Sequence, residues 1–137
     1  MGRVISTEGP GKVRNQHRRT IAEALRILSQ KRELDEEAKD LVAVIVFSLH
    51  GIADTVERTT TAWDKKNYYL KADRFRREWA WVEGAIEELS DLIYRGRWED
   101  LPTFLARLAP RFADVKVSRL TRNPSLWKGA YQRFMQG

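Results

Sequence analysis

Apolar residues, with one threonine among them, recur at alternating intervals of four and three along two neighbouring stretches of the chain. A repeat of this kind places its members on one narrow face of a helix, whereas a strand requires a period of two. The pattern therefore predicts a long antiparallel helical hairpin with arms at about 35–64 and 67–95. The first stripe is Ala38, Val42, Ile45, Leu49, Ile52, Val56, Thr59 and Trp63, and the second is Tyr68, Ala72, Phe75, Trp79, Val82, Ile86, Leu89 and Ile93.

Local signals place the ends of both arms. Asp35 is a favourable N-cap residue, and the two glutamates that follow it put negative charge at the positive end of the helix dipole. The β-branched run 41–47 taken alone fits a buried strand, but the acidic start and the continuous stripe favour a helix. The stripe loses its phase at 64–67, which predicts the turn, and Gly96 suits the position just after the second arm.

A weaker pattern predicts a helix before the hairpin. Apolar residues one turn apart indicate that it begins near 13–15 and ends at about Lys31.

Gly51, in the middle of the first arm of the hairpin, is expected to permit a close helix crossing. The chain then divides into an irregular N-terminal arm, 1–12, and a single all-α domain, 13–137, which is a bundle of four to five helices.

Two more helices are predicted after the hairpin. One starts at about Glu99, has Pro102 in its first turn, and is ended or kinked by Pro110. Asn123 and Pro124 form an N-cap and first-turn pair, which predicts that they open the last helix.

The composition limits the classes of protein to be considered. The chain has 137 residues, 42% of them apolar, and no cysteine, so a core is possible while disulfides and thiolate chemistry are excluded. The longest apolar run, 41–47, is far shorter than the ~20 residues of a membrane span, and the N-terminal region lacks the apolar segment of a secretory signal. We expect a cytoplasmic protein without membrane contact.

The inventory of catalytic side chains is small. There are only two histidines, His17 and His50, and no Glu-x-x-His pair of the kind used by di-iron bundles. Neither histidine has a nucleophile and an orienting acid assembled around it in sequence. We therefore expect no enzyme activity, catalytic residue, metal or cofactor. A ligand-binding or catalytic bundle remains an alternative, and it requires a polar or metal-filled hole in the core.

Positive charge is concentrated at the two ends of the chain. The net charge is +4 over residues 1–20 and +5 over 116–137, whereas the middle of the chain carries −3. Arginines near the start of a helix oppose its dipole, so helix stability does not explain Arg14, Arg18 and Arg19. An anionic partner, RNA or DNA, is one interpretation of this distribution, and solubility alone is the other.

A second basic cluster surrounds the predicted turn, where aromatic residues are interleaved with cations. Phosphates and splayed bases of a nucleic acid suit such a surface. Phe75 and Trp79 belong to the stripe and are expected to be buried, whereas Tyr69 and Trp81 lie off it. Against a single acid, the cations between 65 and 77 are Lys65, Lys66, Lys71, Arg74, Arg76 and Arg77.

The leading hypothesis is a non-enzymatic protein that binds the phosphate backbone of a nucleic acid. As surface residues, Arg18 and Lys66 are expected to contribute little to stability. If the basic groups converge on one face, polyanion binding is favoured, and if they scatter, solvation explains them. The residues assigned to this role are Lys12, Arg14, Arg18, Arg19, Lys65, Lys66, Lys71, Arg74, Arg77, Arg119, Arg122 and Lys128.

The alternative is a structural or adaptor bundle that forms homodimers or docks on a protein partner. Heptad stripes pair equally well within one chain or between chains. Tyr69, Trp81 and Trp127 are the candidate interaction residues. In size, charge and helicity the chain is similar to the small basic helical subunits of ribonucleoprotein effector complexes, so an accessory role in such a complex is a further form of the leading hypothesis.

Overall fold

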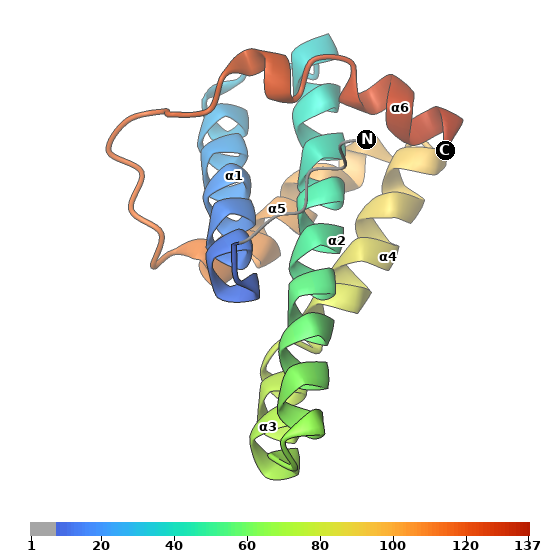
Figure 1. Ribbon diagram of the computed structural model, residues 1–137. Helices are drawn as coiled ribbons and strands as arrows, with labels where there is room; N and C mark the ends of the chain where they lie inside the picture. The colour runs from blue at the N-terminus through green and yellow to red at the C-terminus, as the bar shows by residue number, and fades with distance from the viewer. Residues whose placement is uncertain (1–7) are drawn as a thin grey trace, which may run out of the picture.

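The computed structural model describes residues 8–137, and all the regular secondary structure in this part of the chain is helical, with no strand (Figure 1). The prediction of an all-α bundle is confirmed. None of the described helices is long and apolar enough to cross a membrane. The α-helices are α1 (Pro10–Gln30), α2 (Glu36–Lys65), α3 (Tyr69–Glu78), α4 (Trp81–Tyr94), α5 (Leu101–Leu108) and α6 (Ala130–Gln136), with 3₁₀ turns η1 (Trp98–Asp100), η2 (Ala109–Phe112) and η3 (Pro124–Leu126).

Helix α2 is the centre of the fold and contacts α1, α3, α4 and α6. Its start is fixed by the Asp35 carboxylate, which accepts a hydrogen bond from the Ala38 amide at 2.8 Å. The β-branched run that resembled a strand is helical, and residues 41–46 are all buried. These residues are apolar on every side because neighbouring helices surround this part of α2.

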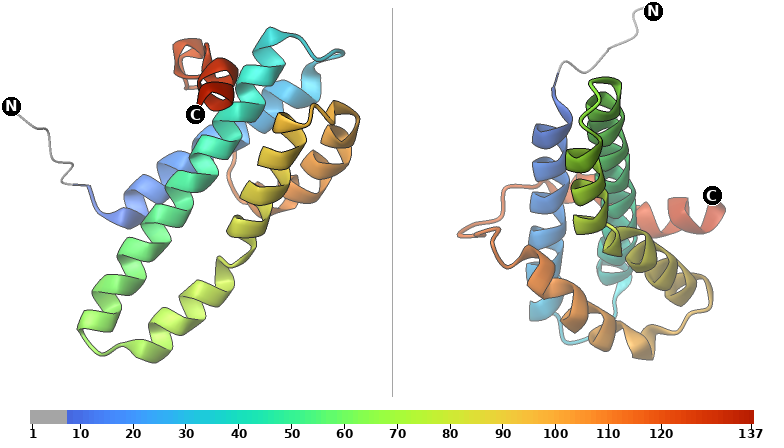
Figure 2. Two further views of the ribbon diagram at one scale, coloured as in Figure 1. Left: turned by 90° about the vertical axis from the view of Figure 1, so that its right-hand side faces the viewer. Right: turned by 90° about the horizontal axis from the view of Figure 1, so that it is seen from below.

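The second arm is not one helix, and here the prediction of a continuous helix over 67–95 is wrong. The chain leaves the helical path at 79–80 and divides the arm into α3 and α4, as the left view of Figure 2 shows. On a continuous helix, residues two apart point in different directions. The break brings the rings of Trp79 and Trp81 to 6.1 Å between centroids. Packing of two large aromatic side chains therefore replaces helical continuity.

Two other predicted helix starts are displaced. Helix α1 begins at Pro10 instead of 13–15, with proline in its first turn, where the missing N–H is harmless. Asn123 and Pro124 open only the single turn η3, and α6 starts later, at Ala130. Residues 1–7, most of the predicted N-terminal arm, lie outside the described range.

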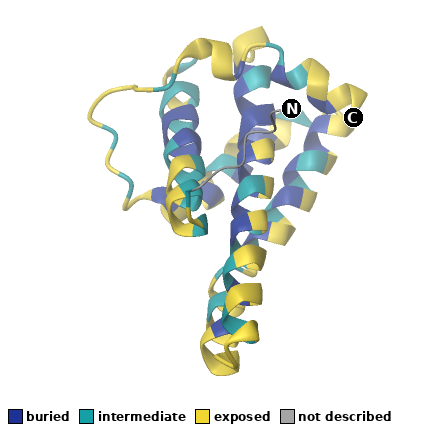
Figure 3. Cartoon of the chain, viewed as in Figure 1, coloured by how far each residue is buried: buried dark blue, intermediate teal, exposed yellow. Residues whose placement is uncertain are grey.

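The large side chains of the stripes become more exposed toward the turn of the hairpin. The first stripe is buried from Ala38 to Ile52, but Trp63 is only half-buried, and Tyr68, expected in the stripe, is 52% exposed. Phe75 and Trp79 are also half-buried, contrary to the expectation of full burial. The reason is that α1, α5 and α6 cover the other end of the hairpin, so its last turns project from the body (Figures 1 and 3). We call residues 63–78 the hairpin tip.

Candidate functional site

Three consecutive large side chains are exposed at the hairpin tip. Tyr68, Tyr69 and Leu70 have relative exposures of 52%, 61% and 63%. The turn before them contains Asn67 in the left-handed conformation, at φ 63°, and its side-chain oxygen accepts a hydrogen bond from the Tyr69 hydroxyl at 2.8 Å. The turn therefore holds one tyrosine ring in place while it remains open to solvent.

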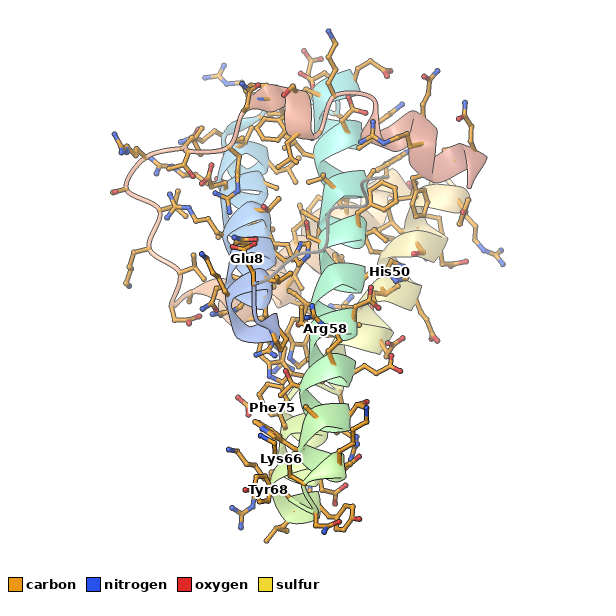
Figure 4. All side chains as sticks on the ribbon, viewed as in Figure 1. Glu8, His50, Arg58, Lys66, Tyr68 and Phe75 are labelled. Atoms are coloured by element: carbon orange, nitrogen blue, oxygen red, sulfur yellow. The ribbon has the colours of Figure 1, made fainter. Side chains whose placement is uncertain are left out.

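Cations surround these three side chains. Lys71 lies with its ammonium group 4.4 Å from the centre of the Trp63 ring, and Arg76 forms an ion pair with Asp64. Figure 4 shows Lys66 close to Tyr68 at the end of the hairpin. The exposed basic side chains of the tip that have no hydrogen bond, ion pair or ring contact within residues 8–137 are Lys65, Lys66, Arg74 and Arg77.

A row of half-buried aromatic rings supports the tip from beneath. Trp63 and Phe75 meet edge to face with centroids 5.2 Å apart, and Phe75 lies 6.2 Å from Trp79. The guanidinium of Arg14 covers Phe75 at 4.7 Å. These contacts fix α3 against α2, so the exposed tyrosines stand on a rigid base.

Arg14 is an anchor between helices. Its guanidinium donates to the hydroxyls of Thr55, at 3.1 Å, and Thr59, at 2.8 Å, and so ties the start of α1 to α2. Burial lowers the pKa of Arg14, and the nearby Glu78 carboxylate partly offsets that change. Because its guanidinium is held against the α2 hydroxyls and the Phe75 ring, we leave Arg14 out of the candidate interface.

Arg18 and Arg19 bind the segment that follows α5. We call residues 113–129 the strap, because this segment runs across α1 toward α6 (Figure 1). Arg18 holds Asp114 with two hydrogen bonds, at 3.0 and 2.6 Å, and lowers the pKa of that carboxyl. Arg19 donates to the carbonyls of Lys116, at 2.9 Å, and Arg119, at 2.7 Å.

The hydrogen bonds of these arginines thus explain their presence in the first half of α1, where positive charge is unfavourable to the helix dipole. Backbone carbonyls of an irregular segment need donors, and arginine presents several in one rigid group. Arg26, about two turns further along the same face of α1, donates to the carbonyl of Val117 in the same way. Together these arginines supply hydrogen bonds that the strap cannot make with itself.

Glu23 is the centre of the strap's attachment and was not identified from the sequence. It is 1% exposed and accepts hydrogen bonds from the Thr121 amide at 2.8 Å, the Thr121 hydroxyl at 2.6 Å, the Arg122 amide at 2.9 Å and Arg19 at 2.7 Å. Burial raises its pKa, but these hydrogen bonds outweigh burial and lower the pKa to about 2. A lone acid between alanines 22 and 24 in an apolar stretch was the available signal.

Of the other predicted basic residues, some are engaged and some are open. Lys12 pairs with Glu8 at 3.1 Å, on the exposed side of α1. Arg122 donates to the Thr20 hydroxyl at 3.1 Å and to the Gln16 carbonyl at 3.1 Å. The side chains of Arg119 and Lys128 are exposed.

The other two candidate interaction residues pack within the chain. Trp81 meets Phe112 edge to face at 6.0 Å and lies under the Arg111 guanidinium at 4.8 Å, so it forms the docking site for η2. Trp127 is 4% exposed, and its indole N–H donates to Glu37 at 3.2 Å. Tyr69 alone of the three remains largely exposed.

The basic groups therefore do not converge on one face. The strap and α6 lie at one end of α2 and the hairpin tip at the other (Figures 1 and 2). Between them, the arginines of α1 are directed at the strap and at the hydroxyls of α2. The tip combines unpaired cations with the exposed rings of Tyr68 and Tyr69.

Neither histidine belongs to a group of side chains that could hold a metal ion in the described part of the chain. His17 is half-buried where α1 crosses α2, and His50 is exposed on α2. Within residues 8–137 no group of three or more His, Asp or Glu side chains is arranged to hold a metal ion.

Comparison of the chain with protein families, curated proteins and solved structures finds no match.

Proposed function

We propose that the protein binds single-stranded nucleic acid through the hairpin tip. The observation that carries this proposal is the exposed pair Tyr68 and Tyr69 beside cations that have no hydrogen bond or ion pair within residues 8–137. The phosphates would be bound by Lys65, Lys66, Arg74 and Arg77, and bases would stack on the tyrosine rings.

The preference for single strands follows from the aromatic rings. In a duplex the base faces are covered by their neighbours, whereas an unpaired base can leave its stack and lie on a tyrosine. Each such contact contributes ~1–3 kcal/mol. The projecting position of the tip gives a flexible strand access from several sides (Figure 3).

The number of open cations sets an expectation for the salt dependence. For single strands, the logarithm of the affinity falls with the logarithm of the salt concentration, with a slope of about −0.7 for each phosphate neutralised. Four contacts at the tip thus imply a slope of about −3. A larger basic surface, with strap and tip acting together, would give a steeper one.

Fluorescence anisotropy with a labelled single-stranded oligonucleotide tests the proposal. In the double variant Lys65→Ala, Lys66→Ala we expect a loss of affinity and a slope shallower by about 1.4, because two phosphate contacts disappear. The matched control is Lys116→Ala, Lys128→Ala, which removes the same charge at the opposite end of the molecule and should leave binding nearly unchanged.

Two results would contradict the proposal. One is the absence of binding at low salt, and the other is an equal loss in the tip variant and in the control, which would show that only total charge matters. Tyr69→Ala adds a second check, since it removes a stacking surface and no charge. An unchanged affinity in that variant would exclude the stacking role.

Leu70 favours a second proposal, in which the tip docks on a protein partner or on a second copy of the chain. It is the most exposed large apolar side chain among the described residues, and an aliphatic side chain offers neither charge nor a stacking surface to a nucleic acid. In that case Leu70→Ser should abolish association while sparing oligonucleotide binding. Light scattering over a range of concentrations distinguishes the copy-to-copy form, because a concentration-independent monomer excludes it.

A further inference from the structure

A cationic groove lies in the body of the molecule, where the strap and α6 pass over α1 and α2. Its volume is about 880 Å³. Three of its lining residues are basic or titratable, namely Arg122, Arg133 and His17, and no aspartate or glutamate lines it. Val44, Phe47 and Leu126 supply an apolar surface beside these polar groups.

Arg122 is held in place by hydrogen bonds and not by an ion pair. Its guanidinium donates to the Thr20 hydroxyl at 3.1 Å, the Thr121 hydroxyl at 3.2 Å and the Gln16 carbonyl at 3.1 Å. All three acceptors are neutral, so the guanidinium makes no direct ion pair; the Glu23 carboxylate bonds the Arg122 amide and the Thr121 hydroxyl instead. A guanidinium has five N–H groups, and those not used here remain for a ligand.

Arg133 reaches the same groove from α6 and is held in a similar way. One of its terminal nitrogens donates to the Lys128 carbonyl at 3.2 Å, again a neutral acceptor, and it has no ion pair within residues 8–137. Two guanidinium groups that form no ion pair within residues 8–137 favour an anion, and phosphate fits the arginine fork with two parallel hydrogen bonds.

The apolar part of the groove indicates what else the ligand carries. Phe47 is 38% exposed and Leu126 is 45% exposed, so both present apolar area to whatever fills the groove. A volume of this size accommodates a ligand larger than a simple ion, within the range of small-molecule sites. Inorganic phosphate would leave most of that space and the apolar surface unused.

We propose that this groove binds a phosphorylated small molecule with an aromatic or apolar part, of about the size of a nucleoside monophosphate. The site is separate from the hairpin tip. Ser48 at the groove and Lys65 at the tip lie about 25 Å apart along α2, at the helical rise of ~1.5 Å per residue. The two proposals therefore stand or fall independently.

Titration of the ¹⁵N-labelled protein with AMP, followed by NMR, tests the site. We expect saturable changes at the amides of Phe47, Ser48 and Arg122, and little change at Tyr69. Adenosine and inorganic phosphate, titrated in parallel, should each bind at least tenfold more weakly than AMP, because each offers only half of the required contacts.

A matched pair of variants separates the groove from general charge. In the structure the Arg133 guanidinium donates one hydrogen bond, to a carbonyl, and Arg133→Gln removes this group. We expect the variant to bind AMP at least about tenfold more weakly. Arg119→Gln removes the same charge from an exposed position of the strap that does not line the groove, and AMP affinity should be unchanged. Thermal melting confirms that both variants fold.

Several results would overturn the proposal. They are the absence of saturable AMP binding in the millimolar range, changes confined to the hairpin tip, inorganic phosphate binding as tightly as AMP, and an equal effect of the two variants. Oligonucleotide binding measured on the same samples reports on the tip. A failure at the groove is therefore distinguishable from a failure at the tip.

Discussion

The imidazole ring of His17 occupies the space that a side chain at position 51 would fill. A Cβ atom placed on Gly51 would lie 2.6 Å from both Cδ2 and Cε1 of the ring, well inside van der Waals contact. At this point the His17 ring on α1 packs against Gly51 on α2, where there is no side chain to exclude it. Gly51 therefore leaves room for the His17 ring between α1 and α2.

Gly51→Ala is therefore expected to destabilise the protein by about 1–3 kcal/mol, as overpacking of a tight contact does. On an open helix surface the same change would stabilise by up to ~1 kcal/mol, because alanine is the better helix former. The sign of the effect is thus informative. Chemical denaturation of both proteins measures it.

The double variant His17→Ala, Gly51→Ala provides the control. Removal of the ring opens the space, so Gly51→Ala in the His17→Ala background should be neutral or stabilising. The two substitutions are then non-additive, which is the signature of direct contact. If Gly51→Ala stabilises the protein that still carries His17, the crossing is not as close as described.

Stability should depend on pH through Glu23. The pKa of this carboxyl is lowered from 4.5 to about 2 in the fold, so its contribution is complete above pH 4.5 and is lost as the pH falls from there toward 2. At neutral pH the contribution is on the order of 3 kcal/mol. Unfolding free energies of the native protein and of Glu23→Gln should differ most near pH 7 and converge at low pH.

The same substitution should release the strap. Limited proteolysis of Glu23→Gln is expected to cut within 113–129 faster than in the native protein, because the amide replaces the oxygen that accepts hydrogen bonds from the Thr121 hydroxyl and Arg19. Glu33→Gln, at an exposed position after α1, is the control with the same change of charge. Equal cleavage rates in the two variants would contradict the role assigned to Glu23.

Arg18 should contribute to stability, contrary to the expectation from sequence. Its side chain is 17% exposed and bonds Asp114 and the Arg111 carbonyl, so Arg18→Ala should cost about 1–2 kcal/mol. Lys66→Ala, at the exposed tip, should change stability by less than ~0.5 kcal/mol. Thermal denaturation of the two variants gives the comparison, and similar shifts in Tm would argue against the contrast.

Helix α6 depends on a residue from another helix for its N-cap. The Asp40 carboxylate accepts hydrogen bonds from the amides of Gly129 at 3.1 Å and Tyr131 at 2.9 Å, and α6 has no side-chain cap of its own. Asp40→Ala should cost about 1 kcal/mol and speed amide hydrogen exchange in α6. Asp40→Asn retains an acceptor and should have a smaller effect, whereas equal exchange rates in native protein and Asp40→Ala would rule out the cap.

Much of the hairpin was predictable because its signals are local. The Asp35 cap, the turn after Asp64 and the end of the second arm at Gly96 each depend on residues within a few positions of one another. Gly96 adopts φ 64°, and the Arg97 amide donates to the Leu92 carbonyl at 2.9 Å, which closes the helix as glycine at this position typically does. Periodicity similarly identified the buried face of α2.

The break between α3 and α4 had no local signal, because neither proline nor glycine lies at 79–80. It arises from packing of Trp79 against Trp81 and of Trp81 against Phe112, a residue about thirty positions away. The sequence likewise gave no indication that Arg14 would reach Thr55 and Thr59. The candidate site was therefore predicted in part: the turn cluster remains, and the arginines of α1 leave it.

The sequence by itself determined the all-α class, the hairpin, most helix ends and the concentration of charge at the chain termini. These properties follow from spacing and residue type along a few turns of chain. Only the tertiary structure decided which charges are open. A hydrogen bond from Arg19 to a carbonyl about a hundred residues away depends on where the strap lies, and that is set by the packing of the whole molecule. Seen from the sequence alone, Arg19 and Lys66 are both basic residues of a predicted surface, yet one secures the fold and the other is available to a partner.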